Sequence, residues 1–121
     1  MQIEDIYKII DQIIKKQKEA RRNNDYLSLM VNAEALLEYI PNLIRFSVEQ
    51  EGEYRKFEAK LSNEYDSAGK KNTSSYCETQ AKATDNYKNW QQSKQFIELM
   101  YEMVQMAKKL AGSVDKEFNA N

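Results

Sequence analysis

Seven side chains in the C-terminal half of the chain recur at a strict seven-residue interval. They are Tyr76, Ala83, Trp90, Ile97, Val104, Ala111 and Phe118. Because helices that pack along one seam repeat every 3.5 residues per turn, this interval is typical of a long helix in a coiled-coil-like arrangement. Only three Gly and one Pro are available to interrupt such helices. We therefore predict an all-α fold in which long helices are joined by short turns.

The few helix-breaking segments divide the chain into three predicted helices, over residues 3–22, 26–67 and 75–111. Residues 23–25, Asn-Asn-Asp, have the composition of a tight turn, with Asp25 as the N-cap of the next helix. Pro41 removes a backbone donor, so the second helix is expected to be kinked there. Residues 67–75 contain no large apolar side chain and are predicted to form an exposed turn. The whole chain, 1–121, is predicted to be a single helical domain.

A second apolar stripe on the third predicted helix indicates how the helices pack. It starts only at residue 96 and comprises Phe96, Leu99, Met103, Met106 and Leu110. At about 100° per residue, the two stripes together cover an arc of roughly 160°, which is too wide for one neighbouring helix. Residues 96–111 therefore need two neighbours, whereas residues 76–94 need one. The predicted architecture is a three-helix bundle from which an antiparallel, coiled-coil-like two-helix hairpin projects, with the turn at 67–75 at its tip.

The composition excludes most catalytic and metal chemistry. The chain has no His and a single Cys, Cys77. The commonest general base is therefore missing, and neither an intrachain disulfide nor a cysteine-based zinc site can form. The sequence contains no recognisable nucleophile–base pair, converging carboxylates or Gly-rich phosphate loop. We predict a protein that is not an enzyme, with no catalytic or cofactor-binding residues, no metal site and no cofactor.

Five cations lie within eight positions near the end of the first predicted helix. They are Lys15, Lys16, Lys18, Arg21 and Arg22. Contact with phosphates requires clustered cations, but cations near a helix C-terminus also stabilise the helix dipole. The net charge of -1 is too balanced to attract the whole molecule to nucleic acid or to a membrane surface. The cluster is either a solvated face or a nucleic-acid site, whose binding would weaken steeply with salt and be lost on replacing all five by Gln.

Many of the aromatic side chains fall in the predicted hairpin, and Tyr and Trp often anchor protein interfaces. They can equally fill the hairpin seam with their polar edges reaching solvent. We predict Tyr87, Trp90 and the tip residues Lys70 and Lys71 as protein-interaction residues. A two-helix hairpin buries only one face of each helix, so it is stabilised by packing on another copy or another protein. The predicted partners are therefore another protein, the chain itself as a homo-oligomer, or both, and no membrane.

The N-terminus, Met-Gln-Ile-Glu-Asp, lacks the basic start and apolar run of a signal peptide. No stretch approaches the roughly 18 apolar residues of a membrane span. We therefore expect a soluble protein made in the cytoplasm.

Four short strings are similar to those of small helical accessory proteins encoded by tailed bacteriophages and prophages. They are Tyr-Arg-Lys-Phe-Glu-Ala-Lys-Leu from Tyr54, Gly-Lys-Lys from Gly69, Tyr-Cys-Glu-Thr-Gln-Ala-Lys-Ala from Tyr76, and Tyr-Lys-Asn-Trp ending at Trp90. The resemblance covers residues 50–120, includes no diagnostic motif, and implies a phage-encoded protein of the bacterial host cytoplasm or the virion. The leading hypothesis is a non-enzymatic helical protein-protein interaction or assembly protein. The alternatives are a nucleic-acid-handling accessory and an inhibitor of a host defence or replication protein.

Overall fold

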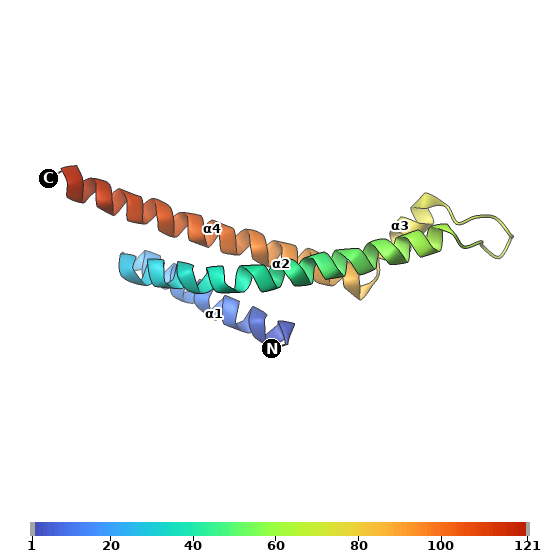
Figure 1. Ribbon diagram of the computed structural model, residues 1–121, viewed down its shortest axis with the longest axis horizontal. Coiled ribbons are helices and arrows are strands. Elements are labelled where there is room, and N and C mark those ends of the chain that lie inside the picture. Colours follow the sequence, from blue (N-terminus) through green and yellow to red (C-terminus); the bar gives the residue numbers. More distant parts are fainter. Residues whose placement is uncertain (1, 121) are drawn as a thin grey trace. The chain divides into compact units, whose positions relative to one another are not determined.

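A computed structural model describes the backbone of residues 2–120 and the side chains of residues 2–112. The described residues form four helices: α1 (Ile3–Arg22), α2 (Tyr26–Ser62), α3 (Ser74–Lys82) and α4 (Asp85–Ala120) (Figure 1). Among the described residues, Tyr65 and Lys71 form an isolated antiparallel β-bridge. The predicted all-α fold class is confirmed.

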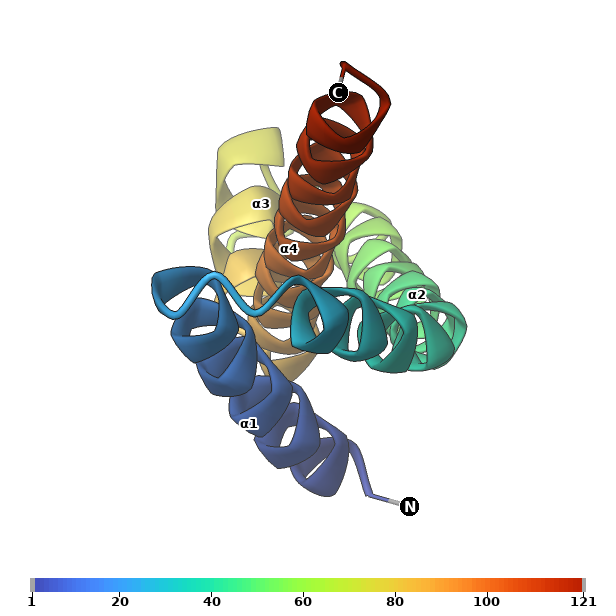
Figure 2. The same cartoon turned by 90° about the vertical axis from the view of Figure 1, so that its left-hand side faces the viewer.

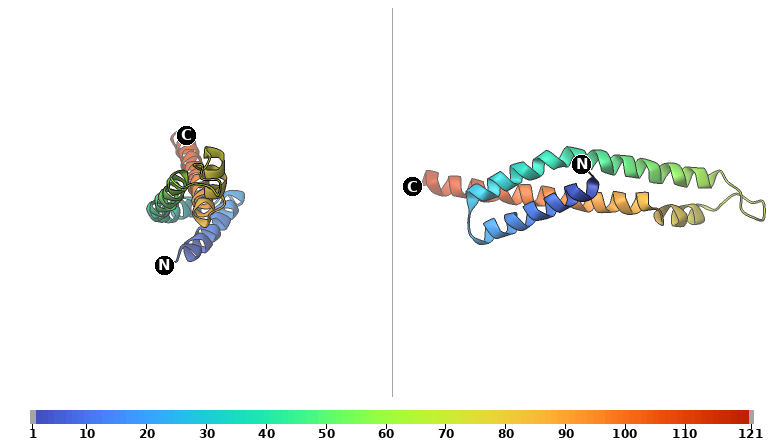
Figure 3. Two further views of the ribbon diagram at one scale, coloured as in Figure 1. Left: turned by 90° about the vertical axis from the view of Figure 1, so that its right-hand side faces the viewer. Right: turned by 90° about the horizontal axis from the view of Figure 1, so that it is seen from below.

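The helices contribute to two compact units. The first, the three-helix unit, contains α1, the part of α2 up to Asn42 and the part of α4 from Phe96. Figure 2 shows these three segments end-on. The second, the hairpin unit, spans Leu43–Gln95 and contains the rest of α2, a loop, α3 and the start of α4 (Figure 3). The predicted helical bundle is therefore present in the three-helix unit.

The core of the three-helix unit receives one face of each helix. Its buried residues are Ile6, Ile10, Ile14, Gln17 and Ala20 of α1, Leu29, Ala33, Leu36 and Ile40 of α2, and Met100, Val104 and Ala107 of α4. The buried residues of α1 recur every three or four positions and include Ile14, whereas the neighbouring Ile13 is only partly buried. Gln17 is fully buried, and its side-chain Nε2 donates a hydrogen bond of 3.0 Å to the carbonyl of Leu29. This bond connects α1 directly to α2.

The turn between α1 and α2 has the predicted chemistry. Asn24 adopts a positive φ of 55°, a conformation that Asn tolerates better than most residues. The Asp25 carboxylate accepts hydrogen bonds from the backbone N–H of Ser28 at 3.2 Å and from its hydroxyl at 2.6 Å. These bonds favour the charged form and lower the pKa of Asp25. The assignment of Asp25 as the N-cap of α2 is confirmed.

The second helix ends earlier than predicted, at Ser62 instead of residue 67. It is one continuous helix through Pro41, the position at which a kink was predicted. Pro41 has no N–H to donate to the carbonyl of Leu37, four residues earlier. Both residues are exposed, so water can solvate that carbonyl instead. At the other end, the Asn72 side-chain Nδ2 donates to the carbonyl of Leu61 at 2.9 Å. Loop side chains thus replace the helical bonds that a longer α2 would make.

The predicted helix over 75–111 is two helices. The break falls at Ala83 and Thr84, between α3 and α4. The Thr84 hydroxyl donates to the carbonyl of Ala81 at 2.7 Å and accepts from the backbone N–H of Tyr87 at 3.3 Å, so it caps both helix ends. The break changes which residues are buried: Cys77 and Ala81 face inward, while Tyr76 of the seven-residue series is exposed. Beyond 111, α4 continues through Gly112, and the side chain of Phe118 lies outside the described residues.

Tyr7 offers a test of this packing. Its ring stacks on Phe96 with 4.4 Å between the centroids, and its buried hydroxyl has no hydrogen-bond partner among the described residues. Because a buried unpaired hydroxyl is costly, Tyr7→Phe is expected to raise the free energy of unfolding by about 1 kcal/mol. Urea unfolding followed by circular dichroism measures the change. An unchanged or lower stability would contradict the burial of this hydroxyl.

The same residue predicts a pH dependence. Burial of the hydroxyl, with a smaller contribution from Glu4, raises the pKa of Tyr7 from 10.0 to about 12. Folding therefore favours the neutral hydroxyl of Tyr7. The stability that depends on this neutral form is fully present below pH 10 and is lost as the pH rises toward 12. Between these pH values the wild type should lose more stability than Tyr7→Phe does.

Candidate interaction surfaces

An aromatic cluster forms the centre of the hairpin unit. Tyr54 is buried, and its ring centroid lies 5.0 Å from that of Tyr87 and 5.6 Å from that of Trp90. Arg55 lies over two of these rings, with its guanidinium carbon 5.2 Å from the Tyr54 centroid and 5.5 Å from the Trp90 centroid. Lys94 approaches the Trp90 ring to 6.0 Å. The predicted interaction residues Tyr87 and Trp90 are thus half-buried members of a packed cluster, in which cation–π contacts cover the rings.

The loop between α2 and α3, residues 63–73, is held by its own hydrogen bonds, and we call it the tip loop. The Asp66 carboxylate Oδ1 accepts from the backbone N–H groups of Ala68 and Lys70, both at 2.9 Å. The Asp66 N–H in turn donates to the carbonyl of Lys70 at 2.7 Å. Gly69 has a φ of 78°, which a side chain would disfavour, so this tight turn suits glycine. The loop has a defined conformation rather than being a plain connector.

Two exposed tyrosines lie in or next to the tip loop: Tyr65 is within it, and Tyr76 is in the first turn of α3. Tyr65 is 68% exposed and Tyr76 is 47% exposed. With Leu61, Glu64, Asp66, Ser67, Asn72 and Thr73 they line a hollow of about 510 Å³. The predicted residues Lys70 and Lys71 are also exposed, but they do not line this hollow. Sequence reasoning missed Tyr65 as a surface residue because the second helix was predicted to continue to residue 67, and it missed Tyr76 because the seven-residue series placed it on the seam.

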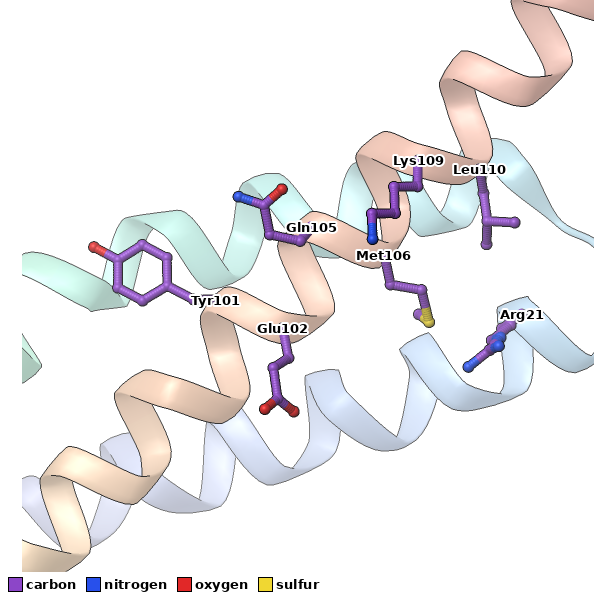
Figure 4. Close-up of a pocket in the computed structure, with 7 residues that line it drawn as sticks. All are labelled: Arg21, Tyr101, Glu102, Gln105, Met106, Lys109 and Leu110. Atoms are coloured by element: carbon purple, nitrogen blue, oxygen red, sulfur yellow. The ribbon is translucent and has the colours of Figure 1, made fainter.

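The five cations of α1, which we call the basic cluster, are all exposed: Lys15, Lys16, Lys18, Arg21 and Arg22. None of them forms an ion pair within the described part of the chain. Arg21 lies at the edge of a groove of about 520 Å³, whose other lining residues all come from α4: Tyr101, Glu102, Gln105, Met106, Lys109 and Leu110. In Figure 4, Met106 and Leu110 extend from α4 toward the end of α1 that carries Arg21. One member of the basic cluster, Arg21, therefore borders an apolar groove.

The part of α2 in the three-helix unit has an exposed face of a different character. Leu27 is 78% exposed, Val31 is 56% exposed and Leu37 is 44% exposed. Glu34 and Glu38 are exposed between and beside them. Residues 23–44 include no Lys or Arg. We call these five side chains the α2 outer face, which is apolar and acidic.

Elsewhere the described residues offer little reactive chemistry. Cys77 is buried, and no three His, Cys, Asp or Glu side chains in the described part of the chain are placed to hold a metal ion. Among the described helices, none combines the length and apolar character that a membrane span requires. Comparison with protein-family models, with curated proteins and with solved structures gives no match for this chain.

Proposed function

We propose that this chain is a non-enzymatic helical protein-protein interaction and assembly protein, encoded by a phage and acting in the bacterial host cytoplasm or the virion. The observation that carries this proposal is the tip loop, which has a fixed conformation and presents two exposed tyrosines, Tyr65 within it and Tyr76 just after it. Tyrosine supplies a large, rigid contact surface with a polar end, and it is enriched where binding energy concentrates. No curated relative supports the proposal, so it depends on this surface.

The fixed loop conformation matters because ordering a mobile loop on binding costs free energy. In the tip loop the Asp66 and Asn72 hydrogen bonds already impose that order. Asn72 also connects the end of the loop to its beginning through the backbone, since its N–H donates to the carbonyl of Glu64 at 3.1 Å. A partner that contacts Tyr65 and Tyr76 would therefore lose less affinity to loop ordering than it would with a flexible loop. Lys70 and Lys71 would add electrostatic attraction to an acidic partner surface.

The test compares capture of bacterial host proteins by the full chain and by the double variant Tyr65→Ser/Tyr76→Ser, with quantitative mass spectrometry of what is retained. Loss of two interface tyrosines is expected to reduce retention of specific partners by at least about tenfold. Tyr26→Ser, which changes an exposed tyrosine of the three-helix unit, is the matched control and should retain them. Equal retention by the double variant would contradict the tip loop as the binding site, provided circular dichroism shows unchanged helix content.

Two other functions have support from particular residues. The exposed basic cluster favours a nucleic-acid-handling accessory, because its cations are available to phosphates. An inhibitor of a host defence or replication protein would use the same tip loop on a different partner. The identity of the proteins retained in the capture experiment separates the inhibitor from an assembly protein.

A further inference from the structure

The three-helix unit presents two surfaces with opposite charge. The basic cluster has five cations within residues 15–22, where Glu19 is the one acidic residue. The α2 outer face has Glu34 and Glu38, and no cation occurs within residues 23–44. Both surfaces are exposed, and no ion pair joins one to the other within the described part of the chain. Positive and negative charges are thus concentrated on different surfaces of this unit, although the whole chain has a net charge of only -1.

Each of these surfaces also carries apolar groups that the chain does not cover. The groove beside Arg21 has Met106 and Leu110 in its wall, and the α2 outer face has Leu27 and Val31 one helical turn apart. An amphipathic helix binds a groove when its apolar anchors enter and its charges meet opposite charges at the rim. On the α2 outer face, Leu27 and Val31 can serve as the apolar anchors. Glu34 and Glu38 carry the charges opposite to those of the basic cluster.

We propose that the α2 outer face of one copy docks in the groove beside Arg21 of a second copy, with Glu34 and Glu38 facing the basic cluster. This inference rests on the proposed role in assembly and names the partner of the three-helix unit as the chain itself. A second copy is the occupant because the chain carries both complementary surfaces, and a contact between two different surfaces joins copies head to tail. Its near-zero net charge also leaves little repulsion between copies.

A charge-swap experiment with the full chain tests the pairing, using light scattering on a sizing column over a range of protein concentrations. The wild type should rise above the monomer mass of 14.2 kDa as its concentration increases, and less so at higher salt. Lys18→Glu/Arg21→Glu and Glu34→Lys/Glu38→Lys should each raise the dissociation constant by at least about tenfold. An equimolar mixture of the two variants should associate again, because the reversed charges of one match those of the other.

The control is Lys8→Glu/Lys60→Glu, which makes the same change in net charge as Lys18→Glu/Arg21→Glu but at two exposed lysines outside both surfaces, and it should leave association unchanged. Circular dichroism of each variant identifies any that fail to fold. Leu27→Ser keeps every charge and removes one anchor, so it should weaken association without altering its salt dependence.

The proposal is overturned by a wild type that is a monomer at every concentration, or by variants that do not associate when mixed. It is also overturned if the chain stays monomeric and Lys18→Glu/Arg21→Glu instead abolishes binding of a labelled DNA duplex, which would assign the basic cluster to nucleic acid. The tip-loop variants and the charge variants change different residues. Failure of the tip-loop proposal and failure of this pairing are therefore distinguishable.

Discussion

Replacing Leu36 with alanine is expected to lower the free energy of unfolding by about 3 to 4 kcal/mol. Leu36 lies on α2 in the core of the three-helix unit and is 0% exposed, so truncation removes buried methyl groups and leaves a cavity. Helix propensity does not offset this loss, because alanine is only slightly better than leucine in a helix. Urea unfolding of the two proteins in dilute solution, followed by circular dichroism, gives the difference.

Leu27→Ala makes the same chemical change on the same helix at a residue that is mostly exposed. It should change the free energy of unfolding by less than about 0.5 kcal/mol in dilute solution, where the proposed pairing of copies does not contribute. Equal losses for the two variants would contradict the assignment of the inner and outer faces of α2.

The second large effect is expected at Tyr54, the buried member of the aromatic cluster. Tyr54→Ala should destabilise the hairpin unit by about 3 kcal/mol, since it removes contacts with Tyr87, Trp90 and Arg55 together. Trp90 is the single Trp of the chain, so its fluorescence reports unfolding of this unit in both proteins. Denaturant titration read by that fluorescence measures the change.

Tyr54→Phe is the matched control for this prediction. It keeps the ring and removes only the hydroxyl, which donates a hydrogen bond of 3.3 Å to the Glu58 carboxylate. Burial of that hydroxyl, together with the nearby Glu58 charge, raises the pKa of Tyr54. The Phe variant should differ from the wild type by less than about 1 kcal/mol. A large loss in this variant would show that the hydroxyl, rather than ring packing, stabilises the cluster.

Local signals in the sequence were sufficient for the parts of the fold that depend on neighbouring residues. Spacing and the scarcity of Gly and Pro predicted the all-α class, and the bounds 3–22 match α1. Asp25 was predicted as an N-cap because its carboxylate reaches a backbone N–H only three residues away. The narrow and wide stripes on either side of residue 96 indicated a unit of three helical segments, and the three-helix unit begins its α4 portion there.

The break between α3 and α4 was not predictable from periodicity. The seven-residue series passes through Ala83 without interruption, but Thr84 caps both neighbouring helix ends and shifts the buried positions. Tyr76 therefore lies outside, whereas Cys77 is buried. The spacing of apolar residues does not depend on the Thr84 hydroxyl, so it gives no sign of the cap that this hydroxyl forms. Tyr76 was missed as a surface residue for this reason, whereas Tyr65 was missed because α2 ends at Ser62 instead of residue 67.

The sequence alone determined that the chain forms helices, where α1 begins and ends, and how its cations cluster, because these properties depend on residues close together in the chain. Only the tertiary structure decided which apolar residues of α2 are covered, because burial depends on helices that are distant in sequence. Leu36 and Leu37 are adjacent and chemically identical, yet one is fully buried and the other is exposed. Packing between segments also placed Arg21 beside Met106 and Leu110, since no local rule relates residues so far apart in the chain.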